Sequence, residues 1–223
     1  GPHPVTAVRF IATLGTDYGV IAVHRDARWQ NLAQVTAALQ RDSARVVFGA
    51  GGTIGSQDWI KAAQLVRAAG QDHRKMRFVA FEGGGEALKA LKGGHLDIFT
   101  GDAAEALQAA AQGLPLRILA VLAPERLQGQ LAGLPTAREQ GIALTWPTVR
   151  GLYMAANTPE AAVRAWTSAF EQALAAPGYA ALCSRYGLYP FARTGAALND
   201  FVQRSLQDYR RLAQDLGLRT WPR

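Results

Sequence analysis

Short apolar runs alternate with amphipathic segments in the first part of the chain. Residues 8–14, 19–24 and 46–48 are rich in β-branched residues and bounded by turn formers, so the pattern predicts strands there. Apolar residues at helical spacing predict helices over 31–41 and 56–69. Each of these helices follows a predicted strand.

The same alternation continues further along the chain. Strands are predicted over 76–81, 96–100 and 116–122, with helices over 86–92 and 103–111 between them. A repeated strand–helix order of this kind favours a mostly parallel sheet with helices on both faces. The expected fold class is therefore α/β.

The character of the sequence changes after residue 123. Prolines and glycines make a looser connecting stretch, and residues 148–155 are predicted to form a strand that crosses back. Thr158, Pro159 and Glu160 give a helix start signal, because they supply a cap, a first-turn proline and an acid near the positive helix end. The remainder is predicted to be helical.

Three glycine-rich turns, at residues 51–56, 83–85 and 101–102, follow three successive predicted strands. The carboxyl ends of parallel strands meet at one edge of a sheet, where ligands bind. Each turn also opens a helix, whose unbonded N–H groups and positive dipole end attract an anion, and glycine lets that anion approach the backbone. The turns therefore predict an anion site, although the same glycines could serve only to make tight connections.

Side chains beside these turns could contact a ligand or could cap the following helix. Thr53, Ser56 and Gln57 add donors next to the first turn, but Ser56 also fits a helix cap. Asp102 could accept a hydrogen bond from a ligand hydroxyl or ammonium group or from water. It could equally cap the helix that begins at Ala103.

Other kinds of site find little support in the sequence. The glycines of the first turn do not follow the dinucleotide fingerprint, and neither a Walker sequence nor a nucleophile elbow occurs. His24, His73 and His95 are isolated from other potential metal ligands. We therefore expect no catalytic residue, no metal and no cofactor.

Composition constrains partners and compartment. The net charge is +7, but Lys and Arg are dispersed singly, which favours a solvated basic surface over a nucleic-acid partner and modestly favours an anionic ligand. Cys183 is the only cysteine, so no intrachain disulfide forms, and its apolar neighbours predict a buried thiol. No stretch approaches the length of a membrane span. Gly1, Pro2 and His3 look like the remnant of protease cleavage, which would have removed any targeting segment.

Three long segments carry a family resemblance. They are VVFGAGGTIGSQDW, MRFVAFEGGGEALKALKGGHLDIFTGDAAEAL and TWPTVRGLYMAANTPEAAV. Through them the chain, from about Val8 to Gly217, resembles the extracytoplasmic solute receptors of tripartite tricarboxylate transporters. The resemblance implies a periplasmic-binding-protein-like fold, in which two α/β lobes close on a carboxylate. Thr53 and Asp58 depart from the family, since many relatives have Asn and His there.

The resemblance also implies ligand contacts and domains. The expected ligand-binding residues are Gly52, Thr53, Ile54, Gly55, Ser56, Gln57, Gly83, Gly84, Gly85, Asp102 and Thr148. Residues 1–17 would form a hinge or crossing strand, 18–145 a complete ligand-binding lobe, and 146–223 the return strand and C-terminal helices of a first lobe. Nothing here matches the segment with which relatives begin their first lobe. That lobe is therefore expected to be incomplete, and a homodimer or a domain swap could complete it.

The leading functional interpretation is a non-catalytic periplasmic receptor. It would capture a small di- or tricarboxylate, such as citrate, and deliver it to membrane transporter subunits. The alternative is the ligand-sensing domain of a bacterial regulator, which uses a similar architecture. An enzyme on an α/β scaffold is the third interpretation.

Overall fold

The computed structural model describes residues 7–218, which form two compact units. Unit 1 consists of the chain up to Thr16 together with the chain from Val149 onward, and unit 2 is Asp17–Thr148. Each unit is described by itself. The suspected cleavage remnant at Gly1–His3 lies outside the described residues.

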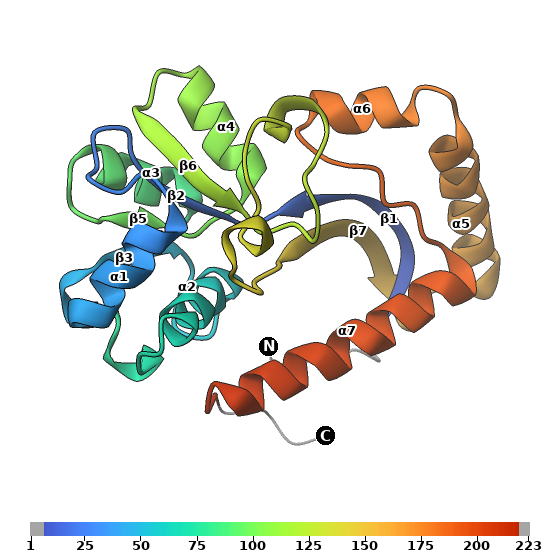
Figure 1. The fold of residues 1–223 in the computed structure, drawn as a ribbon. Coiled ribbons are helices and arrows are strands. Elements are labelled where there is room, and N and C mark those ends of the chain that lie inside the picture. Colours follow the sequence, from blue (N-terminus) through green and yellow to red (C-terminus); the bar gives the residue numbers. More distant parts are fainter. Residues whose placement is uncertain (1–6, 219–223) are drawn as a thin grey trace. The chain divides into compact units, whose positions relative to one another are not determined.

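Unit 2 is a five-stranded sheet with helices between its strands (Figure 1). The strands are β2 (Val20–His24), β3 (Val47–Gly51), β4 (Arg77–Phe81), β5 (Ile98–Phe99) and β6 (Leu116–Val121). The helices are α1 (Leu32–Asp42), α2 (Gln57–Ala68), α3 (Gly84–Lys92) and α4 (Ala103–Ala111), and short 3-10 turns lie at Ser43–Arg45, His73–Lys75, Gly129–Leu131 and Arg138–Gln140. In chain order, α2 follows β3, α3 follows β4 and α4 follows β5.

The sheet of unit 2 has the strand order β4-β3-β5-β2-β6. β3 runs parallel to both β4 and β5, whereas β2 runs antiparallel to β5 and β6. The sheet is therefore mixed, with its parallel part confined to β3, β4 and β5. These three strands end at the same edge, where α2, α3 and α4 begin.

A continuous apolar core explains why unit 2 folds. Val20, Ile21, Ala22 and Val23 of β2 are all fully buried, as expected for a central strand covered on both faces. The helices bury one stripe each; α1, for example, buries Leu32, Val35, Ala38 and Leu39. The apolar residues that recur at helical spacing in the sequence thus form the helix face that packs on the sheet.

Unit 1 has a smaller core. Its two-stranded sheet pairs β1 (Val8–Tyr18) with β7 (Pro147–Ala155), and both strands continue into unit 2. Its helices are α5 (Glu160–Ala175), α6 (Tyr179–Arg185) and α7 (Gly195–Asp215). Ile11, Ala12 and Val163 form the buried cluster, with Met154, Phe170 and Leu174 packed against it. Several large apolar side chains stay exposed: Leu152, Tyr153, Trp166, Leu182, Tyr186 and Tyr209.

Some element boundaries differ from the sequence prediction. β1 is one strand of 11 residues that continues through Gly15, because the N–H groups of Thr13 and Thr16 donate to carbonyls of the segment at Tyr189 and Arg193. α3 begins at Gly84, since the extended Gly83 serves as its N-cap. None of the helices between residues 7 and 218 is long and apolar enough to cross a membrane.

Candidate functional site

The three glycine-rich turns lie together at one edge of the unit 2 sheet. A Cβ built on Gly51 would lie 3.4 Å from the N atom of Gly84 and 3.5 Å from the Cα atom of Gly83, so the β3–α2 and β4–α3 turns are in contact. Cβ atoms built on Gly84 and Gly101 would both collide with the carboxylate of Glu105. That side chain therefore lies between the β4–α3 and β5–α4 turns, and the three helix N-termini converge.

The α2 and α3 N-termini carry N–H groups without an acceptor. Ser56 caps α2 by accepting from the Trp59 N–H at 3.3 Å, and no side chain caps α3. Among residues 7–218, no acceptor is present for the N–H groups of Thr53, Ile54, Gly55, Gln57, Asp58, Gly84 and Gly85. Such groups at two adjacent helix N-termini can bind an anion.

The loop before α2 depends on two glycines with positive φ. Gly52 has φ +80° and Gly55 has φ +87°, a region that side chains with a Cβ rarely adopt. A Cβ on Gly52 would also lie 2.8 Å from the Cβ atom of Ser56. Between these glycines the Ile54 side chain is 74% exposed, which leaves an apolar surface at the tip of the loop.

The α4 N-terminus, in contrast, is occupied by the protein's own acids. Glu105 Oε1 accepts from the Asp102 N–H at 3.0 Å and completes a capping box with the Asp102 side chain. Both carboxylate oxygens of Asp17 lie 3.3 Å from the Ala104 N atom, which donates to them. No second anion is needed at this turn.

A buried lysine joins α2 to the β5–α4 turn. Lys61 is fully buried, and its Nζ atom donates to Gly101 O at 3.0 Å and to Asp102 Oδ1 at 2.8 Å. The same Nζ atom forms an ion pair with Asp58 Oδ1 at 2.9 Å. The hydroxyl of Thr148 donates to Asp102 Oδ1 at 3.1 Å. The buried ammonium of Lys61 thus donates two hydrogen bonds and forms an ion pair with Asp58, and it does not reach solvent.

Carboxylates outnumber ammonium groups in this cluster. Asp58, Asp102 and Glu105 lie around Lys61, and Asp17 lies at the N-terminus of α4 beside them. Burial raises the pKa of Asp58, although the Lys61 ammonium opposes this effect. Burial also raises the pKa of Glu105, and the negative charges of Asp58 and Asp102 add to the increase. The edge thus combines an open backbone anion cradle with a carboxylate, that of Glu105, whose pKa is raised.

The structure brings most of the sequence-predicted contacts together without testing whether they bind a ligand. The loop at residues 52–57 and the glycines at 83–85 lie at the open N-termini of α2 and α3. Asp102 caps α4 and holds Lys61, and Thr148 is 92% buried against Asp102, so these two side chains support the edge from within. Their role as ligand contacts stays a prediction.

Sequence reasoning missed three members of the cluster: Lys61, Asp17 and Glu105. Glu105 had a sequence signal, because an acid three residues after Asp102 completes a capping-box pattern. Lys61 follows Asp58 by one helical turn, a spacing that brings the two side chains together. Asp17 had no local signal, since it reaches α4 only through the fold.

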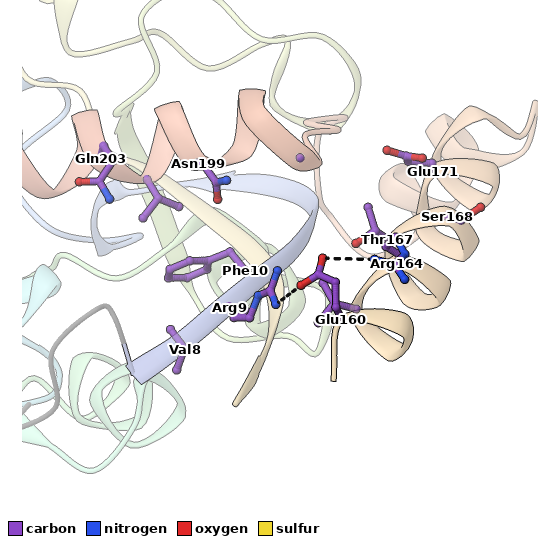
Figure 2. A pocket seen from close by; sticks show the side chains of 13 residues that line it. Val8, Arg9, Phe10, Glu160, Arg164, Thr167, Ser168, Glu171, Asn199 and Gln203 are labelled. Carbon is purple, nitrogen blue, oxygen red and sulfur yellow. Dashed lines mark hydrogen bonds and ion pairs between the residues drawn. The ribbon is translucent and has the colours of Figure 1, made fainter. Parts of the chain in front are cut away.

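Unit 1 contains a separate pocket of about 630 Å³, shown in Figure 2. Most of its charged residues pair with one another: Arg9 Nη1 lies 2.6 Å from Glu160 Oε2, and Arg164 Nη1 lies 4.0 Å from Glu160 Oε1. Glu171 accepts from the Thr194 hydroxyl at 2.9 Å. The Arg9 guanidinium lowers the pKa of Glu160. Because these charges already satisfy one another, we assign no ligand to this pocket. Within residues 7–218, three or more potential ligands do not gather into a metal-binding group.

Comparisons with known proteins place this chain in a family. A protein from Cupriavidus necator, named "UPF0065 protein in gbd 5'region", is 21% identical over 216 residues, and the chain spans 64% of its length. A ligand-free crystal structure of a TctC solute binding protein from Polaromonas is 26% identical, with a TM-score of 0.71 over 96% of this chain and 72% of that one. MatC from Rhodopseudomonas palustris with bound malate is 21% identical, with a TM-score of 0.75 over 92% of this chain and 69% of that one.

These likenesses confirm the periplasmic-binding-protein-like α/β fold that the sequence predicted. The family described as "Tripartite tricarboxylate transporter family receptor" matches residues 2–218, which is nearly the whole chain. We conclude that this chain belongs to the tripartite tricarboxylate transporter receptor family.

Proposed function

We propose that this protein is a non-catalytic receptor that binds a small di- or tricarboxylate in the periplasm and delivers it to membrane transporter subunits. The observation that carries the proposal is the pair of open helix N-termini, at α2 and α3, with their unbonded N–H groups. A carboxylate there would replace its hydration shell with N–H donors and would gain from two helix dipoles.

Family membership supports the same class of ligand. The family is named for tricarboxylate transport, and a structural neighbour of the same fold was solved with malate, a dicarboxylate. Lys61, the buried cation beneath these turns, already contacts Asp58, Asp102 and Gly101, which is consistent with recognition of the ligand through the backbone. Citrate belongs to this ligand class and is the first tricarboxylate to test.

A substitution that removes one backbone donor gives a direct test. Gly85→Pro deletes an unbonded N–H in the first turn of α3, where proline is tolerated, and a Cβ at this position meets no atom within 4 Å. Gly85→Ala adds a Cβ but keeps the N–H, so it is the matched control. Calorimetric titration with succinate, malate, aspartate and citrate should show binding to the native protein.

Affinity should fall at least about tenfold in Gly85→Pro and should hold within about twofold in Gly85→Ala, since one hydrogen bond to a charged group contributes roughly 1.5–3 kcal/mol. The proposal fails if no carboxylate binds while amino acids without a second carboxylate or sugars do. It also fails if Gly85→Pro binds as tightly as Gly85→Ala.

We further propose that unit 1 associates with a second copy of the chain, as a homodimer or by exchange of segments. Its core is small, and Leu152, Tyr153 and Trp166 are exposed on β7 and α5. Burying such side chains between subunits would add apolar contact area. Light scattering coupled to size-exclusion chromatography should give the mass of a dimer, and Tyr153→Lys should shift it to that of a monomer. A monomer at all concentrations would contradict this proposal.

A further inference from the structure

The Glu105 carboxylate lies next to the anion cradle rather than in solvent. A Cβ on Gly84 would collide with Oε2 of Glu105, and one on Gly101 would collide with Oε1, so the carboxylate touches both turns. Its position is maintained by the bond from the Asp102 N–H at 3.0 Å and by the capping box of α4. The Glu105 carboxylate is therefore a fixed part of the site wall.

A ligand carboxylate bound at α3 would come close to this fixed charge. An acceptor bound to the Gly84 N–H lies within about 8 Å of the Glu105 carboxylate, because that N–H is one bond from the α-carbon that Glu105 touches. In a partly buried site, repulsion between two negative charges at this distance weakens binding by about tenfold. Lys61 does not bind the ligand in compensation, since it is fully buried, donates to Gly101 O and Asp102 Oδ1, and pairs with Asp58.

A hydrogen-bond donor on the ligand would replace this repulsion by an attractive contact with Glu105 and so raise the affinity. An ammonium or hydroxyl group next to the bound carboxylate can donate to Glu105, and an ammonium group also cancels part of the added charge. A plain dicarboxylate has no such group. We propose that Glu105 is a specificity-determining residue, which makes the site select a dicarboxylate with an ammonium or hydroxyl substituent over an unsubstituted one.

This inference rests on the proposed function, because it assumes that a carboxylate binds at α2 and α3. Burial raises the pKa of Glu105, although the hydrogen bond from the Asp102 N–H opposes this effect. The distinguishing ligands share one carbon skeleton. Succinate has no substituent, malate has a hydroxyl group, and aspartate has an ammonium group on the carbon next to one carboxylate.

Calorimetric titrations of these three ligands into the native protein and Glu105→Gln at pH 7.5 test the inference. The glutamine is close in shape and can still accept from the Asp102 N–H, so the cap of α4 is kept. We expect the native protein to bind aspartate at least about tenfold more tightly than succinate, with malate between them. In Glu105→Gln, succinate should bind more tightly and aspartate less tightly, so that the two affinities come within about twofold.

Glu125→Gln is the control, because Glu125 is an exposed glutamate of the same unit and its loss changes the net charge equally. It should keep the native order of affinities. Glu105→Ala is a second variant, and its melting temperature shows whether the fold survives without the cap. An unchanged ratio of aspartate to succinate affinity in Glu105→Gln and Glu105→Ala would overturn the inference while leaving the proposed function intact. Failure of all three ligands and of citrate to bind the native protein would overturn both.

Discussion

The Nζ atom of Lys61 lies 2.8 Å from Oδ1 of Asp102, and both side chains are buried. Lys61 belongs to α2 and Asp102 to the β5–α4 turn, so the pair links two of the three glycine-rich turns at this edge of the sheet. The ligand edge is thus held together from beneath by a buried ion pair. Its geometry depends on the buried Lys61 ammonium.

Replacement of Lys61 by Met should destabilise unit 2 strongly. Asp58 and Asp102 would keep their burial but lose the ammonium group that they share, and an uncompensated buried charge costs about 3–5 kcal/mol. Urea unfolding followed by circular dichroism measures the change. Lys89→Met, at an exposed position of α3, is the control and should change the free energy of unfolding by less than about 0.5 kcal/mol. Equal effects of the two variants would contradict the buried ion pair.

Adjacent glycines of α3 should respond in opposite ways to alanine. In Gly84→Ala the new Cβ collides with the Glu105 carboxylate, which must leave the capping box, so we expect a loss of about 1–2 kcal/mol. In Gly85→Ala the Cβ meets nothing within 4 Å, and reduced flexibility of the unfolded chain should stabilise by about 0.5 kcal/mol. Thermal unfolding of both variants makes the comparison. Equal melting temperatures would show that Glu105 does not lie where the structure places it.

The contribution of Glu105 to stability should decrease as pH rises. Its pKa is raised in the folded state, so the folded protein binds this proton more tightly than the unfolded chain does. The contribution is therefore fully present below the ordinary glutamate pKa, about 4.3, and is lost as pH rises through the folded-state pKa. Urea unfolding of the native protein and Glu105→Gln from pH 4 to pH 8 measures the difference between their unfolding free energies.

That difference should shift in favour of Glu105→Gln with increasing pH. Glu139 must contribute in the opposite direction, because Arg126 lowers its pKa to about 2, but it is common to both proteins and cancels. A difference that grows in favour of the native protein as pH rises would mean that the pKa of Glu105 is lowered instead.

The thiol of Cys183 should report on the integrity of unit 1. The sequence prediction of a buried thiol is confirmed, since Cys183 is 4% exposed and its Sγ atom lies 3.6 Å from Leu14 O. Reaction with a disulfide reagent should be at least about 100-fold slower in the native protein than in guanidinium chloride, which corresponds to an opening free energy of about 3 kcal/mol. A thiol that reacts at the unfolded rate would show that α6 does not stay packed on β1.

Local pattern was sufficient for much of this protein. The alternation of apolar runs and amphipathic segments predicted the strands and helices of unit 2, because each element must bury one face or stripe in the core. The glycine-rich turns were located correctly. Tight connections after parallel strands often need a residue with positive φ, and glycine adopts such a φ most readily, as at Gly52 and Gly55. The capping role of Ser56 and Asp102 also follows from residues within one helical turn.

Only the tertiary structure decided which of those helix starts remains open. The N-termini of α2, α3 and α4 look alike in sequence, yet Asp17 and Glu105 fill the third, and Asp17 comes from a distant point in the chain. The reversed direction of β2 and the burial of Lys61 between Asp58 and Asp102 are likewise long-range outcomes. Such features depend on which groups the fold brings within hydrogen-bond distance, and the sequence period of a single helix or strand carries no information about that.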